Sequence, residues 1–183
     1  MSEQNKCVYN FVIDGIDSSI ANSLRRIIIG KIPTIVIDTV CIQKNDSAYC
    51  DEMICNRLGL IPLKREETET KTNYSITLEE NGPKTVYSRD IIFPSGISPV
   101  SGDIIIIKLN DKETIKLSGY TEEGTALENA KWSASCGTSY KQLTKTSYEF
   151  HIETTGCISA KDCFLKSIDI LKEDLVKVKK LIS

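Results

Sequence analysis

The chain has 183 residues, of which 40% are hydrophobic and 26% are charged, and its formal net charge is −2. A chain of this length can form one large domain or two small ones. The near-neutral charge argues against a protein that holds nucleic acid over most of its surface. Nor does any apolar run approach the roughly 20 residues that span a bilayer.

The amino-terminal part predicts a strand followed by an amphipathic helix. Residues 6–13 (KCVYNFVI) are rich in β-forming side chains. Asp17, Ser18 or Ser19 can cap the helix that follows, and Gly30 can end it. Apolar side chains recur along one side of this helix, namely Ile20, Leu24, Ile27 and Ile28.

The next segments predict a strand, a short helix and a loop. Residues 34–45 are apolar at both alternating sets of positions, which indicates a strand covered on both faces. Residues 47–62 predict a helix that Ser47 caps and Gly59 ends. Residues 64–73 are charged and rich in threonine, and we expect an exposed loop there.

The middle of the chain is rich in short strand candidates, and a long helix closes it. Turn-forming clusters such as ENGP and PSGISP separate the candidates. The predicted middle strands are 74–78, 84–88, 103–109 and 113–120. A last strand at 148–154 precedes a helix over about 159–182.

The long helix carries the clearest pattern of the sequence, an apolar seam with heptad spacing. Its members are Phe164, Ile168, Leu171, Leu175, Val178 and Ile182. A helix of this length would run about 36 Å. Two interpretations are open: the seam packs on the protein's own sheet, or it forms a protein–protein contact. The length favours a contact with another protein, mixed with packing inside the chain.

The sequence contains few of the motifs and residues that catalysis uses. It has neither a Gly-rich phosphate loop nor a GxSxG elbow, and His151 is its only histidine. The seven cysteines include no CxxC pair, so buried thiols are favoured over metal ligands. An odd number of cysteines without a secretory signal indicates a reducing compartment, the cytosol or the nucleus. A cysteine-dependent enzyme built around Cys136 is the alternative hypothesis.

Two stretches in the expected order and separation resemble a known family. ANSLRRIIIGKIPTIVID, followed by DEMICNRLGLIPLK, resembles the α-like subunit of multisubunit DNA-directed RNA polymerases. Members include the third subunit of eukaryotic RNA polymerase II, its archaeal counterpart and the bacterial alpha N-terminal domain. YSRDI, AKWSASCGTSY and the ending of strand, glycine and long helix add to the resemblance, which covers nearly the whole chain.

The resemblance implies an α+β fold with two interleaved parts. Residues 1–34 and 147–183 would form a discontinuous dimerisation domain of the RNA polymerase alpha type. Residues 35–146 would form an inserted β-rich domain.

The function implied by the resemblance is that of a non-catalytic assembly subunit of a DNA-directed RNA polymerase. The chain would form a heterodimer with a smaller α-like subunit, and the pair would be the platform that recruits the second-largest subunit. No cofactor, metal, membrane or specific DNA contact is expected. The expected location is the cytoplasm or the nucleus.

The resemblance also assigns two sets of interface residues. The contact with the α-like partner is expected from Ile20, Leu24, Ile27, Ile28, Phe164, Ile168, Leu171, Leu175, Val178 and Ile182. The contact with the large subunit is expected from Asn22, Arg25, Arg26, Arg57, Leu58, Gly59, Leu60 and Pro62. Since neighbouring helical residues point about 100° apart, Arg25 and Arg26 cannot both make the same contact.

Two departures from the family pattern carry further expectations. Many relatives hold zinc or an iron–sulphur cluster in the inserted domain, but residues 56–135 contain no cysteine, so such a site is expected to be absent. The bacterial carboxy-terminal DNA-binding module is also expected to be missing after the long helix. Such a compact chain suggests a polymerase encoded by a large DNA virus, with the virion as a further location.

Overall fold

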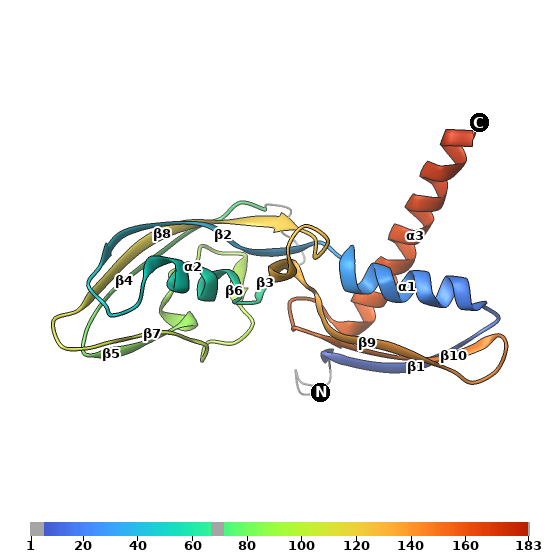
Figure 1. Ribbon diagram of the computed structural model, residues 1–183, viewed down its shortest axis with the longest axis horizontal. Helices are drawn as coiled ribbons and strands as arrows, with labels where there is room; N and C mark the ends of the chain where they lie inside the picture. Colours follow the sequence, from blue (N-terminus) through green and yellow to red (C-terminus); the bar gives the residue numbers. More distant parts are fainter. Residues whose placement is uncertain (1–5, 67–71, 183) are drawn as a thin grey trace. The chain divides into compact units, whose positions relative to one another are not determined.

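The computed structural model describes residues 6–66 and 72–182 (Figure 1). The described part contains these α-helices: α1 (Ser18–Gly30), α2 (Asp51–Gly59) and α3 (Ala160–Ile182). Its strands are β1 (Val8–Asp14), β2 (Thr34–Asn45), β3 (Leu63–Arg65), β4 (Ser75–Asn81), β5 (Lys84–Tyr87), β6 (Ile97–Pro99), β7 (Ile105–Leu109), β8 (Thr114–Gly124), β9 (Ser135–Gln142) and β10 (Ser147–Thr154). Two 3-10 helices, η2 (Ser88–Asp90) and η3 (Ala130–Trp132), complete the order. Helices and antiparallel sheets together make an α+β fold.

The chain divides into two compact units. The first unit contains the residues up to Thr34 and those from Gly124 on, and the second unit is Ile35–Glu123. The predicted boundary after residue 146 is therefore wrong. Strand β9, which was not predicted, pairs antiparallel with β10 from Tyr148↔Gln142 to Thr154↔Ser135. Because that pairing ties β9 to the end of the chain, residues 124–146 belong to the first unit.

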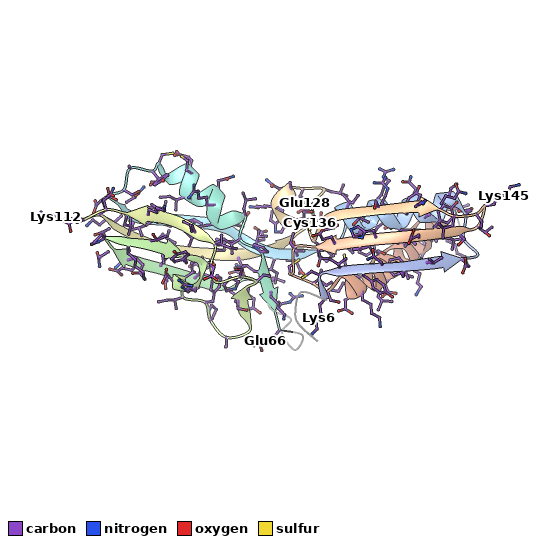
Figure 2. All side chains as sticks on the ribbon, turned by 90° about the horizontal axis from the view of Figure 1, so that it is seen from below. Lys6, Glu66, Lys112, Glu128, Cys136 and Lys145 are labelled. Carbon is purple, nitrogen blue, oxygen red and sulfur yellow. The ribbon has the colours of Figure 1, made fainter. Side chains whose placement is uncertain are left out.

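In the first unit, helices α1 and α3 lie against one face of a three-stranded antiparallel sheet with the order β1-β10-β9 (Figure 1). Lys145 marks the turn between β9 and β10 (Figure 2). Inward side chains of alternate strand positions meet both helices, as period-two alternation requires. An aromatic group forms the centre: the ring of Phe11 lies 4.6 Å from that of Phe164 and 5.6 Å from that of Phe150.

Hydrogen bonds at their first turns fix the starts of both long helices. Of the three candidates, Asp17 is the cap of α1, and its Oδ1 accepts from the Ile20 N–H at 2.9 Å. This bond and a second one from the Ser19 hydroxyl lower the pKa of Asp17. At α3 the Ser159 hydroxyl oxygen accepts from the Asp162 N–H at 3.1 Å. Side-chain oxygens thus satisfy N–H groups that a helix start leaves without partners.

The KWS stretch also belongs to the first unit. Trp132 is buried, and its carbonyl oxygen accepts a hydrogen bond from Thr34 Oγ1 at 2.7 Å. Gly124 lies so close that a Cβ there would come within 2.6 Å of the Trp132 ring. A side chain larger than hydrogen at position 124 would therefore displace the indole.

The second unit has its own core, built on a three-stranded sheet with the order β2-β8-β4. Two-stranded pairs, β5 with β7 and β3 with β6, complete it. Helix α2 packs against β7 through Ile54 and Leu58, which are at most 1% exposed. The other large residues in the core of the second unit include Ile37, Ile61, Ile76, Leu78, Ile106 and Ile107.

Several local predictions in the second unit differ from the structure. Strand β2 is buried on both faces only over its first four residues and alternates after that. Helix α2 begins after Cys50, while Ser47 donates to the Asn45 side chain in the preceding turn. The loop predicted at 64–73 includes part of β3, and its residues 67–71 lie outside the described part. Strand β6 replaces a predicted turn, because pairing with β3 sets its conformation.

Candidate subunit interface

One apolar stripe runs along α3, buried in its first half and open in its second. In the first half, Cys163 is 0% exposed and Phe164 is 8% exposed. In the second half, the exposed fractions are 61% for Leu175, 52% for Val178 and 82% for Ile182. Phe164, Leu175, Val178 and Ile182 share one side of the helix, since steps of three, four and seven return to the same face. We call Leu175, Val178, Leu181 and Ile182 the open stripe.

The open stripe begins where α1 ends. Lys31, the C-cap residue of α1, forms an ion pair with Asp174 at 2.6 Å. This pair lowers the pKa of the Asp174 carboxyl. Every residue of the open stripe follows Asp174, and Figure 1 shows α3 continuing past α1 to its carboxy-terminal end. The first unit therefore covers the stripe only as far as its own helix pair extends.

The structure separates the residues expected at the α-like partner into three groups. Leu24, Ile27, Ile28 and Phe164 are at most 8% exposed and lie in the core of the first unit, so their assignment to a partner surface is wrong. Ile168 and Leu171 are half-buried at the edge of that core. Ile20, Leu175, Val178 and Ile182 are exposed. Heptad spacing marks an apolar face without showing which protein covers it.

The outer face of α1 holds the first part of the surface expected to meet the large subunit. Asn22 and Arg25 are half-buried, and the Arg25 guanidinium donates to Asn22 Oδ1 at 2.9 Å. Arg26 is exposed beside them. Ile29, which was not among the residues expected at this surface, is 41% exposed and lies within about 40° of Arg25 and Asn22 around the helix. This face therefore combines an exposed cation, Arg26, with an apolar side chain, whereas the Arg25 guanidinium is hydrogen-bonded to Asn22.

The other residues expected to meet the large subunit lie at and just after the end of α2, and they divide between the core and the surface of the second unit. Leu58 is 0% exposed and Gly59 is also buried, so their assignment to an interface is wrong. Arg57 donates to the Ile106 carbonyl oxygen at 2.9 Å, and its guanidinium lies 5.6 Å from the centre of the Tyr49 ring. Leu60, by contrast, is 59% exposed. Pro62 is half-buried.

Replacing Arg57 by alanine is expected to destabilise the second unit by about 1 kcal/mol. The change removes a charge-assisted hydrogen bond to strand β7 and a cation–π contact, both partly open to solvent. Urea unfolding followed by far-UV circular dichroism measures the effect. Arg26→Ala is the control and should leave the curve unchanged. An unaltered midpoint in Arg57→Ala would contradict a structural role.

Comparison with known proteins decides the family. A family model described as the RNA polymerase Rpb3/Rpb11 dimerisation domain matches residues 10–175. The chain belongs to this family. The matched range includes α1, the whole second unit and most of α3.

Named relatives of this Rpb3/Rpb11 family chain are polymerase subunits. The DNA-directed RNA polymerase subunit Rpo3 of Methanocaldococcus jannaschii is 36% identical over 84% of this chain and 80% of its own length. The DNA-directed RNA polymerase II subunit rpb3 of Dictyostelium discoideum is 33% identical over 72% of this chain and 53% of its own length. The DNA-directed RNA polymerase subunit Rpo3 of Pyrococcus horikoshii is 36% identical over 74% of this chain and 55% of its own length. The chain thus spans little more than half of the second and third relatives. Viral origin stays a prediction.

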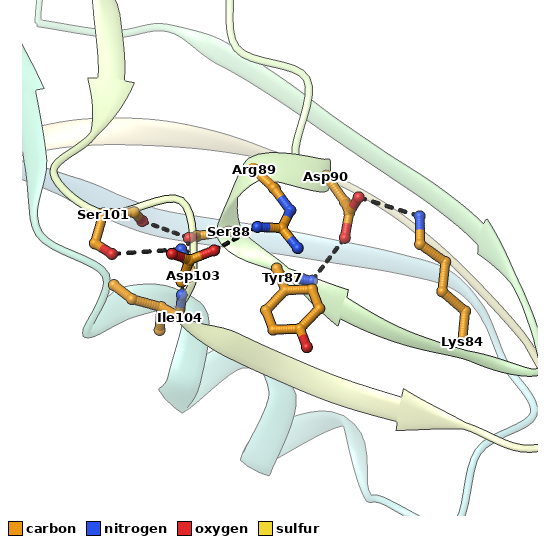
Figure 3. A network of polar contacts seen from close by, with 8 residues as sticks. All are labelled: Lys84, Tyr87, Ser88, Arg89, Asp90, Ser101, Asp103 and Ile104. Carbon is orange, nitrogen blue, oxygen red and sulfur yellow. Dashed lines mark hydrogen bonds and ion pairs between the residues drawn. The ribbon is translucent and has the colours of Figure 1, made fainter.

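A polar network in the second unit contains the YSRDI stretch (Figure 3). The Ser88 hydroxyl donates to the Ser101 carbonyl oxygen at 2.5 Å. The Arg89 guanidinium lies 4.4 Å from the centre of the Tyr87 ring and forms an ion pair with Asp103. These contacts join η2 to the segment before β7. The Ser88 hydroxyl and the charges of Arg89 and Asp103 all have partners within the second unit. This arrangement fits a role in stabilising the fold.

Asp90 completes this network. Its carboxylate accepts from the Tyr87 N–H at 2.7 Å and from Lys84 at 3.1 Å. Burial acts to raise the pKa of Asp90, but these two partners outweigh it, so the pKa lies below its usual value. A charged carboxylate held in this way stabilises the turn above its ordinary pKa, and that stability is lost as the pH falls through the lowered value.

Cys136 and Cys163 lack the environment of a nucleophile. Burial, with the Glu153 carboxylate adding to it, raises the pKa of the Cys136 thiol. Burial also raises the pKa of Cys163 to about 12. His151 shares a hydrogen bond with Asn10 at 2.6 Å and lies opposite Ser139 in the sheet. An activated thiolate needs a lowered pKa, so this geometry gives no support to the alternative of an enzyme built around Cys136.

Thiol labelling near pH 7 is expected to separate the cysteines by exposure and by thiol pKa. Cys41 and Cys50 should react readily because they are exposed, Cys136 should react more slowly because its pKa is raised, and Cys163 should react only after unfolding. Peptide mass spectrometry after timed labelling gives each rate. Labelling of Cys136 more than about tenfold faster than Cys41 would show an activated thiolate and would revive the enzyme hypothesis.

Two further features of the described residues concern metals and membranes. Within residues 6–66 and 72–182, three or more His, Cys, Asp or Glu side chains do not converge in a way that could hold a metal ion. The helices of that same part lack the combination of length and apolar character needed to cross a membrane.

Proposed function

We propose that this chain is an assembly subunit of a DNA-directed RNA polymerase that pairs with a smaller α-like subunit through the open stripe of α3. One observation carries the proposal: an apolar stripe that enters the core in the first half of α3 continues exposed in the second half. The family model is described as a dimerisation domain, and the named relatives are polymerase subunits. Both fit a helix face that a second chain completes.

In this proposal the chain is non-catalytic, and nucleotide addition belongs to the assembled polymerase. The chain would act where that polymerase assembles, in the cytoplasm or the nucleus. Exposed leucine and isoleucine side chains on a projecting helix favour association, so the isolated chain should self-associate or dissolve poorly.

Co-expression with a smaller α-like subunit from the same source tests the pairing. Size-exclusion chromatography with native mass spectrometry should show a 1:1 complex. Burial of the open stripe should also raise the solubility of the chain compared with expression alone. A monodisperse monomer that ignores the α-like subunit would contradict the proposal.

The heterodimer would in turn recruit the second-largest subunit of the polymerase. Support comes from exposed side chains that combine charge and apolar area, Arg26 with Ile29 on α1 and Leu60 after α2. Arginine suits such a surface because its guanidinium binds carbonyl and carboxylate oxygens in pairs while packing on apolar area.

Replacing Arg26 and Ile29 together by alanine is expected to spare the 1:1 heterodimer and to weaken capture of the second-largest subunit about tenfold or more. Both side chains are exposed in the first unit, so their loss should not alter its core. Capture on an immobilised tagged heterodimer measures the effect. Equal capture by the parent and the variant would contradict a role of this face of α1 in recruiting the second-largest subunit.

A further inference from the structure

The two edges of the sheet in the first unit are of different kinds. Strand β1 forms one edge and β9 the other, with β10 between them (Figure 2). The β9 edge is mostly polar, and its pairing with β10 has a register shift between Glu153 and Thr154. The β1 edge reads VYNFVID and pairs with β10 over seven residues without a shift. Charged side chains and bulges keep an edge strand from pairing with other chains, and β1 has neither before its last residue, Asp14.

Strand β1 is apolar on both of its faces, and both faces are partly open. On the outer face, away from the helices, Val8 is 40% exposed and Val12 is 49% exposed. On the inner face, Tyr9, Phe11 and Ile13 are half-buried, whereas the inner aromatic and aliphatic side chains of β10 are at most 1% exposed. Strands that are apolar on both faces are usually covered by other elements. The composition of β1 therefore indicates a strand with a neighbour on each side.

Half of the backbone groups of β1 point away from the sheet. The Thr154 N–H donates to the Cys7 carbonyl oxygen at 2.9 Å, so these two residues form a hydrogen-bonded pair of the ladder. Such pairs alternate along an antiparallel ladder, and the N–H and C=O groups of the even-numbered residues from Val8 to Asp14 therefore face the open edge. Within residues 6–66 and 72–182, these groups have no backbone partner. Together they form a template for one more strand.

The outer face beside this edge is acidic near the end of β1. Asp14 ends the strand, and Glu149 of β10 lies directly opposite Val12. Both carboxylates are exposed, and neither forms an ion pair with the residues that the structure describes. Lys141 lies opposite Glu149 on the far strand β9, and Lys6 precedes β1 at its other end. A side chain directly opposite Asp14 on an added strand would lie about 5 Å away, close enough for a charge pair.

We infer that the free edge of β1 takes up an extended segment of another protein as a fourth strand of this sheet. The segment would carry aliphatic side chains on the inner face and a lysine or arginine on the outer face, opposite Asp14. Backbone hydrogen bonds along the edge provide affinity in this mode of recognition, and alternate side chains provide selectivity. The inference does not depend on the open stripe of α3.

A second copy of this chain fits the edge less well than a basic segment. Two β1 edges in antiparallel pairing would give Asp14 no cation, because the strand itself contains neither lysine nor arginine. Lys6 lies in a helical turn before the strand and is not part of the ladder. Charge complementarity therefore favours a different chain.

Two nine-residue peptides provide the probe. Both carry valine at alternate positions, and the positions between are all lysine in one peptide and all glutamate in the other. Fluorescence anisotropy with the full chain at low salt should show about fivefold or tighter binding of the lysine peptide. Asp14→Lys should reverse the preference. Asp111→Lys, the same change at an exposed aspartate of the second unit, is the matched control and should keep the preference of the parent.

Backbone methylation of the lysine peptide separates strand addition from other kinds of binding. In an added strand, alternate N–H groups face β1. Methylation of one alternate set of nitrogens should therefore abolish binding, and methylation of the other set should leave it within about twofold of the parent peptide. Hydrogen exchange followed by NMR should show at least about tenfold slower exchange of the Val8, Asn10 and Val12 amides in the complex. The Tyr9 and Phe11 amides, which already face β10, should change little.

Four results would overturn the inference. Binding of neither peptide would show that the edge takes up no such segment. Equal binding of the two peptides would remove the basic chemistry of the partner. Equal loss of binding in both methylated peptides, or in neither, would exclude an added strand. Slow exchange of the Val8 and Val12 amides that grows with the concentration of the chain alone would assign the edge to a second copy.

Discussion

Replacing Leu175 and Val178 together by aspartate is expected to abolish the 1:1 complex with the α-like subunit and to leave the fold intact. Both side chains are more than half exposed in the free chain, so the free chain loses little by the change. Full burial of a leucine or valine contributes about 1.5–3 kcal/mol, and a carboxylate at the same place would have to lose its water. The two losses together weaken binding by at least about a hundredfold. Isothermal titration with the purified α-like subunit measures it.

The helix itself offers a matched control. Val176→Asp makes the same chemical change two residues from Val178, about 200° around the helix, at a side chain that is 51% exposed. This variant should bind the α-like subunit as the parent does. Loss of binding in Val176→Asp would mean that any such substitution at the end of α3 disturbs the whole helix. The experiment would then not identify the open stripe as the binding surface.

Replacing Phe164 by alanine is expected to lower the free energy of unfolding of the first unit by about 3–5 kcal/mol. Phe164 is 8% exposed and its ring contacts Phe11 and Phe150, so the change leaves a cavity between the sheet and α3. A loss of this size is a large part of the stability of a typical domain. Trp132 is the single tryptophan and is buried in the first unit, so its fluorescence during denaturant unfolding reports this unit.

Leu165 provides the comparison for this experiment. It is the next residue along α3 and is 47% exposed, so Leu165→Ala should change stability by less than about 0.5 kcal/mol. If Phe164→Ala kept the parent's unfolding midpoint and lost only partner binding, the sequence-based assignment of Phe164 to the partner surface would be right and the structural one wrong.

Periodicity predicted the helices well because local signals determine them. Asp17 before α1, the serine before α3 and the apolar spacing of both helices lie within a few residues of what they control. The same spacing could not tell Phe164 from Leu175, since both occupy one face. Their difference depends on where α1 ends, as the Lys31–Asp174 pair shows, and that is a property of the folded unit.

Features set by distant partners could not be predicted in this way. Strand β9 contains Gly137 and is mostly polar, and its conformation comes from pairing with β10. The carbonyl oxygen that Arg57 binds belongs to Ile106, 49 residues away. The family resemblance pointed to Arg57 as an interface residue, but only the fold shows that its guanidinium already has a partner.

Hydrogen exchange of the chain, free and in complex with the smaller α-like subunit, tests the central claim most directly. The claim is that the partner covers the part of α3 that the first unit leaves open. Amides of residues 172–182 should exchange at least about tenfold more slowly in the complex, because the covered helix no longer frays. Amides of α2 in the second unit should exchange as in the free chain. Unchanged exchange over 172–182, with new protection confined to Ile35–Glu123, would contradict the account.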